Sequence, residues 1–164
     1  SKKVLLVEAD MRMPTLGRLF GYTAEQGLAD LLAGMVTDYR KCVVRAEDTE
    51  GLEILPVGAL PPNPQELLAS DTMRQLIKTL RSAYDVIILD LPPVGVVSDA
   101  GVIAELVDRY IMVVRANFSD TSAIDAMLGE MDKTSMHGAG FVLTDVPKKR
   151  SSYYYDRKKT AETV

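Results

Sequence analysis

The chain has 164 residues, of which 47% are hydrophobic and 26% are charged, as is typical of one ordinary globular domain. Its one cysteine, Cys42, and its one histidine, His137, exclude an internal disulfide, a thiolate metal cluster and a site built from several histidines. No apolar run approaches the roughly 20 residues that cross a bilayer, and no secretory signal opens the chain. We therefore expect a cytoplasmic protein.

The net charge of −4 is distributed unevenly along the chain. Residues 148–164 carry six Lys or Arg against two acidic residues, so this segment has a charge of +4 and residues 1–147 have −8. Such a basic segment can bind phosphate, an anionic membrane or the acidic body of a neighbouring copy, or it can remain a solvated terminus. We expect a folded domain over residues 1–147 and a disordered tail over residues 148–164.

Short apolar runs alternate with helical patterns along the chain. The runs are rich in Val and Ile, which is typical of strands buried on both faces of a parallel sheet. The helical patterns begin with Ser-Asp pairs, which are good N-caps. In chain order we expect a strand at 3–9, extended pieces at 42–45 and 52–55, a helix from about 70, a strand at 85–90, a helix from about 98, a strand at 109–116, a helix from about 119 and a strand at 138–145. This order predicts an α/β fold with a doubly wound, mostly parallel sheet.

Ligands of such sheets bind at the carboxyl ends of the strands, so the residues that end each run are the candidates for a site. These residues are Glu8, Asp10 and Arg12 after the first run, Asp90 after the second, Arg115 in the third, and Thr144 and Asp145 in the fourth. Carboxylates and an arginine at one edge suit a magnesium ion and a polyphosphate. Such residues also commonly cap the next helix or turn.

Asp90 is the strongest of these candidates. It follows four apolar residues, which is the Walker B pattern of nucleotide-binding folds. The chain has no G-x-x-x-x-G-K-[ST] motif, and none of its glycines is followed by lysine. It therefore holds half of a phosphate site without the loop that would cradle the phosphates.

These motifs resemble one family, the bacterial tyrosine kinases of capsule and exopolysaccharide export. The family has a P-loop fold related to the MinD and ParA ATPases. The stretch VLLVEADMRMPT is similar to its second phosphate-site motif, called Walker A prime. The stretches GLADLLAG, GALPPNPQELLAS and YDVIILDLPPVGVVSDA are similar to further signatures in the family's order. The resemblance covers nearly all of residues 3–156.

The resemblance also accounts for the missing loop. In this family the Walker A motif lies one strand and one helix upstream of Walker A prime, so Ser1 would fall just after that helix. We expect a partial P-loop NTPase fold that lacks this strand and helix. We also expect that the 164 residues alone do not phosphorylate tyrosine.

The family's roles are carried over onto matching residues of this chain. Asp90 matches the Walker B carboxylate that organises Mg²⁺, and Asp10 matches the second acid of Walker A prime in the same metal and phosphate cluster. Glu8 stands where the family has the proposed base that accepts the tyrosine proton. Arg12, Arg115 and Thr144 are the residues expected to bind ATP.

Three departures from the family pattern favour weak or regulatory activity. Glu8 replaces aspartate and adds a methylene, and a shift of about 1 Å in a reacting group can cost roughly 100-fold in rate. Leu91 stands where threonine is common. Thr144 stands where an asparagine near the adenine is expected.

The resemblance gives the tail a role as well. Tyr153, Tyr154 and Tyr155 are similar to the family's autophosphorylation cluster, and the tail of a neighbouring subunit in a ring-like homo-oligomer would be the substrate. A transmembrane activator of polysaccharide export would hold the enzyme at the inner face of the membrane, and no nucleic-acid partner is expected. Two other functions remain open: an ATPase switch of the MinD/ParA type, and a non-catalytic interaction module.

Overall fold

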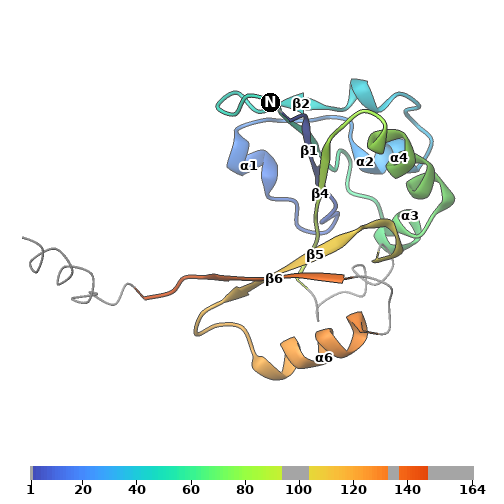
Figure 1. Ribbon diagram of the computed structural model, residues 1–164. Helices are drawn as coiled ribbons and strands as arrows, with labels where there is room; N and C mark the ends of the chain where they lie inside the picture. The colour runs from blue at the N-terminus through green and yellow to red at the C-terminus, as the bar shows by residue number, and fades with distance from the viewer. Residues whose placement is uncertain (1, 94–103, 133–136, 148–164) are drawn as a thin grey trace, which may run out of the picture.

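The structure, a computed structural model, describes residues 2–93, 104–132 and 137–147 (Figure 1). Its elements in chain order are β1 (Val4–Glu8), α1 (Leu16–Phe20), α2 (Leu28–Leu32), the 3₁₀ turn η1 (Tyr39–Lys41), β2 (Val44–Arg45), β3 (Leu52–Leu55), α3 (Pro64–Leu68), α4 (Asp71–Arg81), β4 (Val86–Asp90), the 3₁₀ turn η2 (Ala104–Leu106), β5 (Arg109–Arg115), α6 (Thr121–Met131) and β6 (His137–Thr144). Helices and strands interleave along the chain, which confirms the predicted α/β class.

The strands form two sheets. The larger sheet has the order β2-β3-β1-β4, with β1 parallel to both β3 and β4 and with β2 antiparallel to β3. The smaller sheet consists of β5 and β6, which are parallel to each other. The mostly parallel pairing agrees with the sequence, whereas the division into two sheets does not follow from the order of elements.

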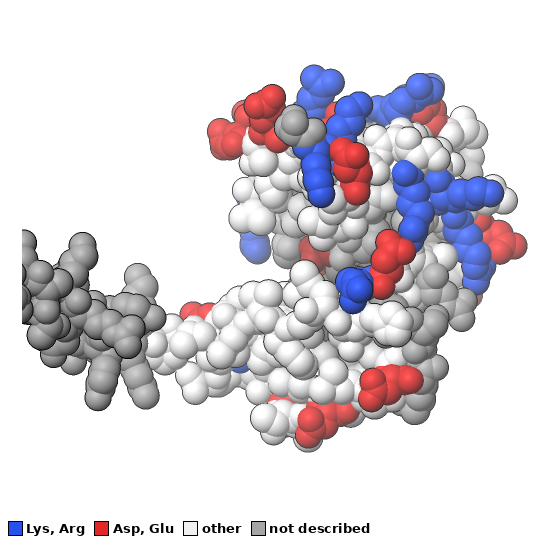
Figure 2. Space-filling view, viewed as in Figure 1, with Lys and Arg blue, Asp and Glu red and all other residues white. Residues whose placement is uncertain are grey.

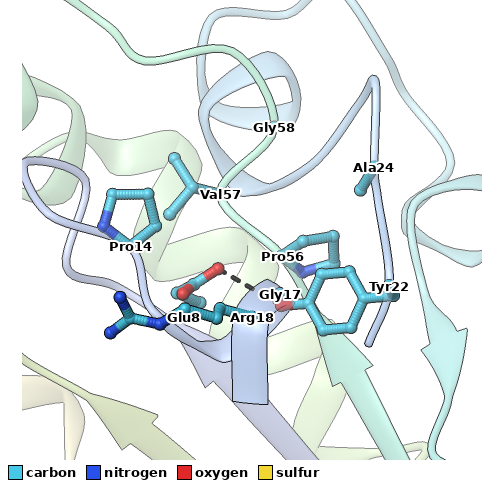
Figure 3. Close-up of a pocket in the computed structure, with 9 residues that line it drawn as sticks. All are labelled: Glu8, Pro14, Gly17, Arg18, Tyr22, Ala24, Pro56, Val57 and Gly58. Carbon is cyan, nitrogen blue, oxygen red and sulfur yellow. Dashed lines mark hydrogen bonds between the residues drawn. The ribbon is translucent and has the colours of Figure 1, made fainter. Parts of the chain in front are cut away.

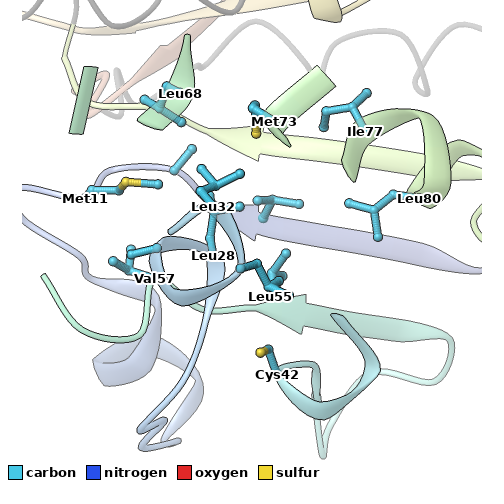
Figure 4. Packing of buried hydrophobic residues seen from close by; sticks show 14 of the residues in the cluster. Met11, Leu28, Leu32, Cys42, Leu55, Val57, Leu68, Met73, Ile77 and Leu80 are labelled. Carbon is cyan, nitrogen blue, oxygen red and sulfur yellow. The ribbon is translucent and has the colours of Figure 1, made fainter. Parts of the chain in front are cut away.

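The core lies around β1, the second strand from the β4 edge of the larger sheet. Leu5 and Val7 of β1 are fully buried, because strands flank β1 on both sides and helices cover it. Figure 4 shows side chains of α2 and α4 converging on this region. The buried cluster includes Leu28, Leu32, Cys42, Leu55, Val57, Leu68, Met73, Ile77 and Leu80. Each buried aliphatic side chain contributes about 1.5–3 kcal/mol, so this cluster is the main source of stability.

The helix caps agree with the sequence. The Ser70 hydroxyl accepts a hydrogen bond from the Met73 amide at 3.2 Å and so caps α4, whose buried residues recur at helical spacing. The Asp120 carboxylate accepts one from the Ser122 amide at 2.9 Å at the start of α6, which keeps the pKa of Asp120 below its ordinary value. Arg81 in the last turn of α4 donates to Asp108 at 3.0 Å and ties this helix to the start of β5.

The smaller sheet differs from the expectation of strands buried on both faces. Every residue of β6 is exposed, and β5 alternates between exposed and covered positions. Ile111 and Val113 of β5 are 62% and 65% exposed. The physical reason is that β5 and β6 pair only with each other, and the described residues leave much of their surface uncovered.

Several expectations fall outside the described residues. These are most of the helix expected from about residue 98, and the tail at 148–164 with Tyr153, Tyr154 and Tyr155. In the part of the chain that is described, no helix has the length and apolar character needed to span a membrane.

Candidate active site

The carboxyl ends of β1 and β4 lie side by side. The register of these parallel strands sets Glu8 opposite Asp90, and the Ala9 amide donates to the Asp90 carbonyl oxygen at 2.8 Å. The pairing thus continues into the loop that holds Asp10. Three carboxylates, those of Glu8, Asp10 and Asp90, therefore come together at one edge of the larger sheet, as the strand-end rule predicts.

Asp10 is held in place by its own loop. Its Oδ1 accepts hydrogen bonds from the backbone amides of Arg12 and Met13, at 3.1 and 2.9 Å, which is an Asx turn. The Met11 amide closes the same turn on the Ala9 carbonyl at 3.0 Å. The sequence EADMRMP therefore folds locally so that the Asp10 carboxylate is pre-oriented beside the strand ends.

The pKa of Asp90 is shifted by its surroundings at this edge of the sheet. Partial burial raises the pKa of its carboxyl above the ordinary value, and the negative charges of Glu8 and Asp10 raise it further. A carboxylate among like charges at a sheet edge is a favourable position for a cation, whose charge would reverse this effect. Asp90 and Asp10 thus fit the role of magnesium ligands.

Magnesium does not require a complete protein cage. Within residues 2–93, 104–132 and 137–147, no group of three or more His, Cys, Asp or Glu side chains could hold a metal by itself. Mg²⁺ is usually bound by one or two carboxylates together with water and substrate phosphates. Asp10 and Asp90 match that mode, in which the nucleotide supplies the remaining oxygens.

Glu8 is more constrained than the sequence suggests. Its side chain is only 2% exposed, and both carboxylate oxygens have protein partners. Oε1 accepts from the Leu16 amide at 2.6 Å, and Oε2 accepts from the Tyr22 hydroxyl at 3.3 Å (Figure 3). Because Leu16 is the first residue of α1, Glu8 provides a partner for an amide that has none within the helix.

Tyr22 is a site residue that the sequence did not reveal. Burial raises the pKa of its hydroxyl, and the charge of Glu8 and the hydrogen bond to it raise it further. Tyr22 reaches Glu8 because Gly21, the residue that follows α1, has a φ of 71° and reverses the chain. The Tyr22 amide then donates to the Gly17 carbonyl at 3.1 Å. The glycine after a short helix was the available signal, but it identifies no partner for the tyrosine.

A hollow of about 160 Å³ adjoins this pair (Figure 3). Side chains and backbone from three segments line it: Glu8 from β1, the region of α1 and the turn after it, and the backbone that follows β3. The lining residues are Glu8, Pro14, Gly17, Arg18, Tyr22, Ala24, Pro56, Val57 and Gly58. The hollow brings a guanidinium, a carboxylate and a phenol into one small polar space.

The far wall of this hollow is fastened to α2. The Leu28 and Ala29 amides donate to the Pro56 and Val57 carbonyls at 2.7 and 2.9 Å. Asp30 is buried, and its Oδ2 accepts from the Gly27 amide at 2.8 Å. A Cβ on Gly27 would collide with the backbone of Pro56, so the glycine permits this close approach.

Arg115 and Thr144 are grouped apart from the three carboxylates. They are register partners on β5 and β6, and Thr144 Oγ1 donates to the Val114 carbonyl at 3.4 Å. Arg115 makes an ion pair with Asp145 at 2.7 Å and lies over the Phe118 ring at 5.3 Å. The contacts of both residues thus lie within the smaller sheet, at Asp145 directly after β6, and in the turn that follows β5. Their role in binding ATP stays a prediction.

Comparison with known proteins places the chain in a family. No protein-family model matches it. CapB of Staphylococcus aureus, which is named as a tyrosine-protein kinase, is 34% identical over 154 residues, and the match covers 93% of this chain and 67% of CapB. The chain belongs to the bacterial tyrosine kinases.

Two further comparisons support this kinase membership. Tyrosine-protein kinase etk of Escherichia coli is 33% identical over 153 residues, which cover 93% of this chain but only 21% of that relative. Its solved kinase domain matches with a TM-score of 0.84 and 32% identity, over 93% of this chain and 59% of that domain. The chain thus spans two thirds of CapB and about a fifth of the etk kinase.

The fold of this kinase chain is also that of MinD. MinD of Pyrococcus horikoshii, solved in complex with Mg-ADP, matches with a TM-score of 0.69 and 26% identity over 87% of this chain and 57% of the MinD chain. The predicted P-loop NTPase class is thereby confirmed.

Proposed function

We propose that this protein is an ATP- and Mg²⁺-dependent tyrosine autokinase that regulates the synthesis and export of capsular polysaccharide or exopolysaccharide. The observation that carries the proposal is the register of β1 and β4, which sets Glu8 beside Asp90 and carries the pairing into the Asp10 loop, in a chain of the tyrosine-kinase family. Relatives named for the cps region of Klebsiella pneumoniae and as EpsB of Ralstonia support the polysaccharide context.

Asp90 and Asp10 would hold the magnesium ion, which neutralises charge on the phosphates of ATP. The raised pKa of Asp90 supports this assignment. A carboxylate that is repelled by neighbouring negative charges is stabilised strongly by a bound cation. The backbone of Arg12 lies in the Asx turn that orients the Asp10 carboxylate, and its guanidinium is the candidate ligand for the phosphates.

In the transfer itself, the phenolic oxygen of the substrate tyrosine bonds to the γ-phosphorus. The bond from that phosphorus to the oxygen bridging the β and γ positions breaks, and ADP leaves. The phenolic proton passes to a carboxylate, for which Glu8 is the candidate. Glu8 Oε2 already accepts a hydrogen bond from a tyrosine hydroxyl, that of Tyr22, so a substrate tyrosine must displace Tyr22 or share that oxygen.

The tail and the surroundings of the enzyme belong to the same proposal. Tyr153, Tyr154 and Tyr155 are the acceptors, presented by a neighbouring subunit of a ring-like homo-oligomer. Their basic flanks favour attraction to a body that carries −8. A transmembrane partner of the polysaccharide-export type would hold the cytoplasmic enzyme at the inner face of the membrane, and co-purification of the full-length gene product from membranes tests this.

The full-length gene product, incubated with ATP and Mg²⁺, tests the activity. We expect phosphotyrosine at residues 153–155 by mass spectrometry, no phosphotyrosine in EDTA, and none from the 164-residue chain alone. ATP hydrolysis without phosphotyrosine would instead indicate a switch of the MinD/ParA type, which the likeness to Mg-ADP-bound MinD favours as the second candidate. Neither reaction in the presence of nucleotide would indicate a non-catalytic interaction module.

A further inference from the structure

Arg18 is a cation in the hollow beside Glu8 that no step of the proposed transfer uses. It lies between two contacts of that carboxylate, since the Leu16 amide donates to Oε1 at 2.6 Å and the Tyr22 hydroxyl donates to Oε2 at 3.3 Å. Both ends of this short segment are thereby fastened to Glu8, so the fold sets the position of Arg18 relative to the candidate base. Among the described residues that line the hollow, Arg18 and Glu8 are the charged ones.

The guanidinium of Arg18 is available to an anion. No described residue forms a hydrogen bond or an ion pair with this side chain. On α4, by contrast, Arg74 is paired with Asp71 at 2.9 Å and Arg81 with Asp108 at 3.0 Å. Figure 2 shows the same difference, because Lys and Arg side chains gather over α4 together with acidic ones, whereas few charged side chains lie over α1. The cation beside Glu8 therefore has its binding capacity unused.

The Glu8 carboxylate lies between the phenol and the guanidinium of the hollow. In Figure 3 the Tyr22 hydroxyl is on one side of this carboxylate, and the Arg18 guanidinium extends on the other side. A substrate tyrosine that takes the place of the Tyr22 hydroxyl would leave the guanidinium facing the next part of the substrate chain. Neighbouring side chains of an extended peptide point to opposite sides. The side chain adjacent to the acceptor tyrosine is therefore the one expected to meet Arg18.

The charges of the hollow determine which neighbouring side chain is favoured. A guanidinium binds a carboxylate or a phosphate through two parallel, charge-assisted hydrogen bonds. Without Arg18, an anion at this place would meet the negative charge of Glu8 and be repelled. We therefore expect the hollow to prefer an acceptor tyrosine that has an anionic neighbour over one whose neighbours are neutral.

The sequence of the tail offers such a neighbour at one end of the tyrosine cluster. In SSYYYDRKK, Tyr155 is followed by Asp156. Tyr153 and Tyr154 adjoin only serine and tyrosine. Each transfer replaces the phenolic proton of one tyrosine by the γ-phosphoryl group of one ATP and releases one ADP and one proton. The phosphotyrosine that forms carries about −1.5 to −2 at neutral pH, so it becomes an anionic neighbour of the next tyrosine.

We propose that Arg18 orders the phosphorylation of the tyrosine cluster by binding an anionic side chain next to the acceptor. The Asp156 carboxylate serves first, and each new phosphate serves next. The tyrosines are then phosphorylated in the order Tyr155, Tyr154, Tyr153. This order does not require Arg18 to distinguish the preceding residue from the following one, because the first anion stands at one end of the cluster. The inference rests on the proposed autokinase activity and adds the substrate preference of the same site.

Binding is measured first, without nucleotide and in EDTA, so that the result does not depend on catalysis. The probe is a synthetic peptide of residues 148–164 with phosphotyrosine at position 155, and fluorescence anisotropy gives its Kd for the full-length gene product. Arg18→Gln should weaken this binding by about tenfold or more, because it removes both hydrogen bonds and the charge. Arg40→Gln removes an exposed arginine outside the hollow and should leave the Kd unchanged.

The order is then determined by tandem mass spectrometry of the unphosphorylated peptide after brief incubation with the enzyme, ATP and Mg²⁺. The first phosphate should be on Tyr155, in about tenfold excess over the other two tyrosines. Asp156→Asn in the peptide should remove this excess, and adding Arg18→Gln in the enzyme should cost no more than either change alone.

A first phosphate on Tyr153 or Tyr154, additive losses, or a Kd that Arg18→Gln does not change would each overturn the inference. Absence of phosphotyrosine from every peptide would instead overturn the proposed function. The ordering would fall with it, and the Kd values would still show whether Arg18 binds the anion.

Discussion

The two sheets of this protein are built from similar sequences and have very different surroundings. VLLVE of β1 and RYIMVVR of β5 are both apolar runs rich in β-branched residues, yet Leu5 is fully buried and Val113 is 65% exposed. β1 has a parallel neighbour on each side and helices over it, whereas β5 has β6 alone. The comparison teaches that an apolar run predicts a strand, whereas its neighbours decide how far it is buried.

The largest expected effect is on the rate of phosphorylation, and it differs between the two sheets. Asp90→Ala in the larger sheet should abolish tyrosine phosphorylation by the full-length gene product, a loss of about 1,000-fold or more, because it removes the candidate magnesium ligand. Arg115→Ala in the smaller sheet should reduce the rate by about tenfold at most, since its contacts are with Asp145 and Phe118. Phosphotyrosine quantified by mass spectrometry gives both rates. Equal losses would mean that one site spans both sheets.

The second prediction concerns the stability of the 164-residue chain. Leu5→Ala should lower the free energy of unfolding by about 2–5 kcal/mol, because it opens a cavity in the buried core. Phe141→Ala removes a larger side chain from β6, but it should cost less than about 0.5 kcal/mol, because that side chain is 58% exposed. Urea titrations followed by circular dichroism measure both values. A cost above 1 kcal/mol for Phe141→Ala would show that β6 is covered in solution.

The third prediction compares two similar tyrosine–glutamate hydrogen bonds, of which only one is expected to affect the rate of phosphorylation. Tyr22 donates to Glu8 at 3.3 Å, and Tyr84 donates to Glu53 at 2.6 Å, and burial raises the pKa of both hydroxyls. Each Tyr→Phe change should lower stability by about 1–2 kcal/mol, because a carboxylate oxygen loses its partner. Only Tyr22→Phe should also change the rate of phosphorylation, since Glu8 is the candidate base.

In the same experiment, an unchanged rate in Tyr22→Phe would mean that Glu8 is purely structural. Glu8→Asp provides the complement. This change introduces the aspartate of the family pattern. Its side chain is one methylene shorter than that of Glu8, so we expect it to lose the contacts with Leu16 and Tyr22. We expect the change to raise autophosphorylation while lowering stability by about 2 kcal/mol or more, since two hydrogen bonds are lost. A slower enzyme would mean that the site depends on the length of glutamate.

The smallest effect is a pH dependence of stability. Burial and the charges of Glu8 and Asp10 hold the pKa of Asp90 above its ordinary value of 3.8, so folding favours its protonated form. Its contribution is fully present below pH 3.8 and is lost as the pH rises through the raised pKa. Asp90→Asn should therefore be more stable than wild type at pH 7, within about 1 kcal/mol, and similar at low pH. Melting curves in EDTA at both pH values test the sign, and a less stable Asp90→Asn at pH 7 would contradict it.

Local signals in the sequence were sufficient to predict the strands, the caps of α4 and α6, and the proximity of three carboxylates. Ser70 and Asp120 cap helices as expected, because capping depends on residues only two or three positions apart. Asp90 and Glu8 meet because parallel strands end at the same edge, which is a property of the fold class.

Contacts between distant segments could not be predicted from the sequence. Nothing in GYTAE indicates that Tyr22 turns back to Glu8, because the contact depends on the length of α1 and on the turn at Gly21. The exposure of β5 and β6 was also missed, because apolar content measures what a strand prefers and not what covers it. Both failures concern tertiary neighbours, which no local pattern encodes.

The attachment of Pro56–Gly58 to the start of α2 has a mechanical consequence. Backbone hydrogen bonds at Leu28 and Ala29 join the two segments, and Gly27 and Gly58 leave no room for a side chain between them. The wall of the hollow and the start of α2 are therefore one packed unit. A change in the backbone at Pro56–Gly58 requires a matching change at Gly27–Ala29, so the shape of the hollow depends on a helix that does not line it.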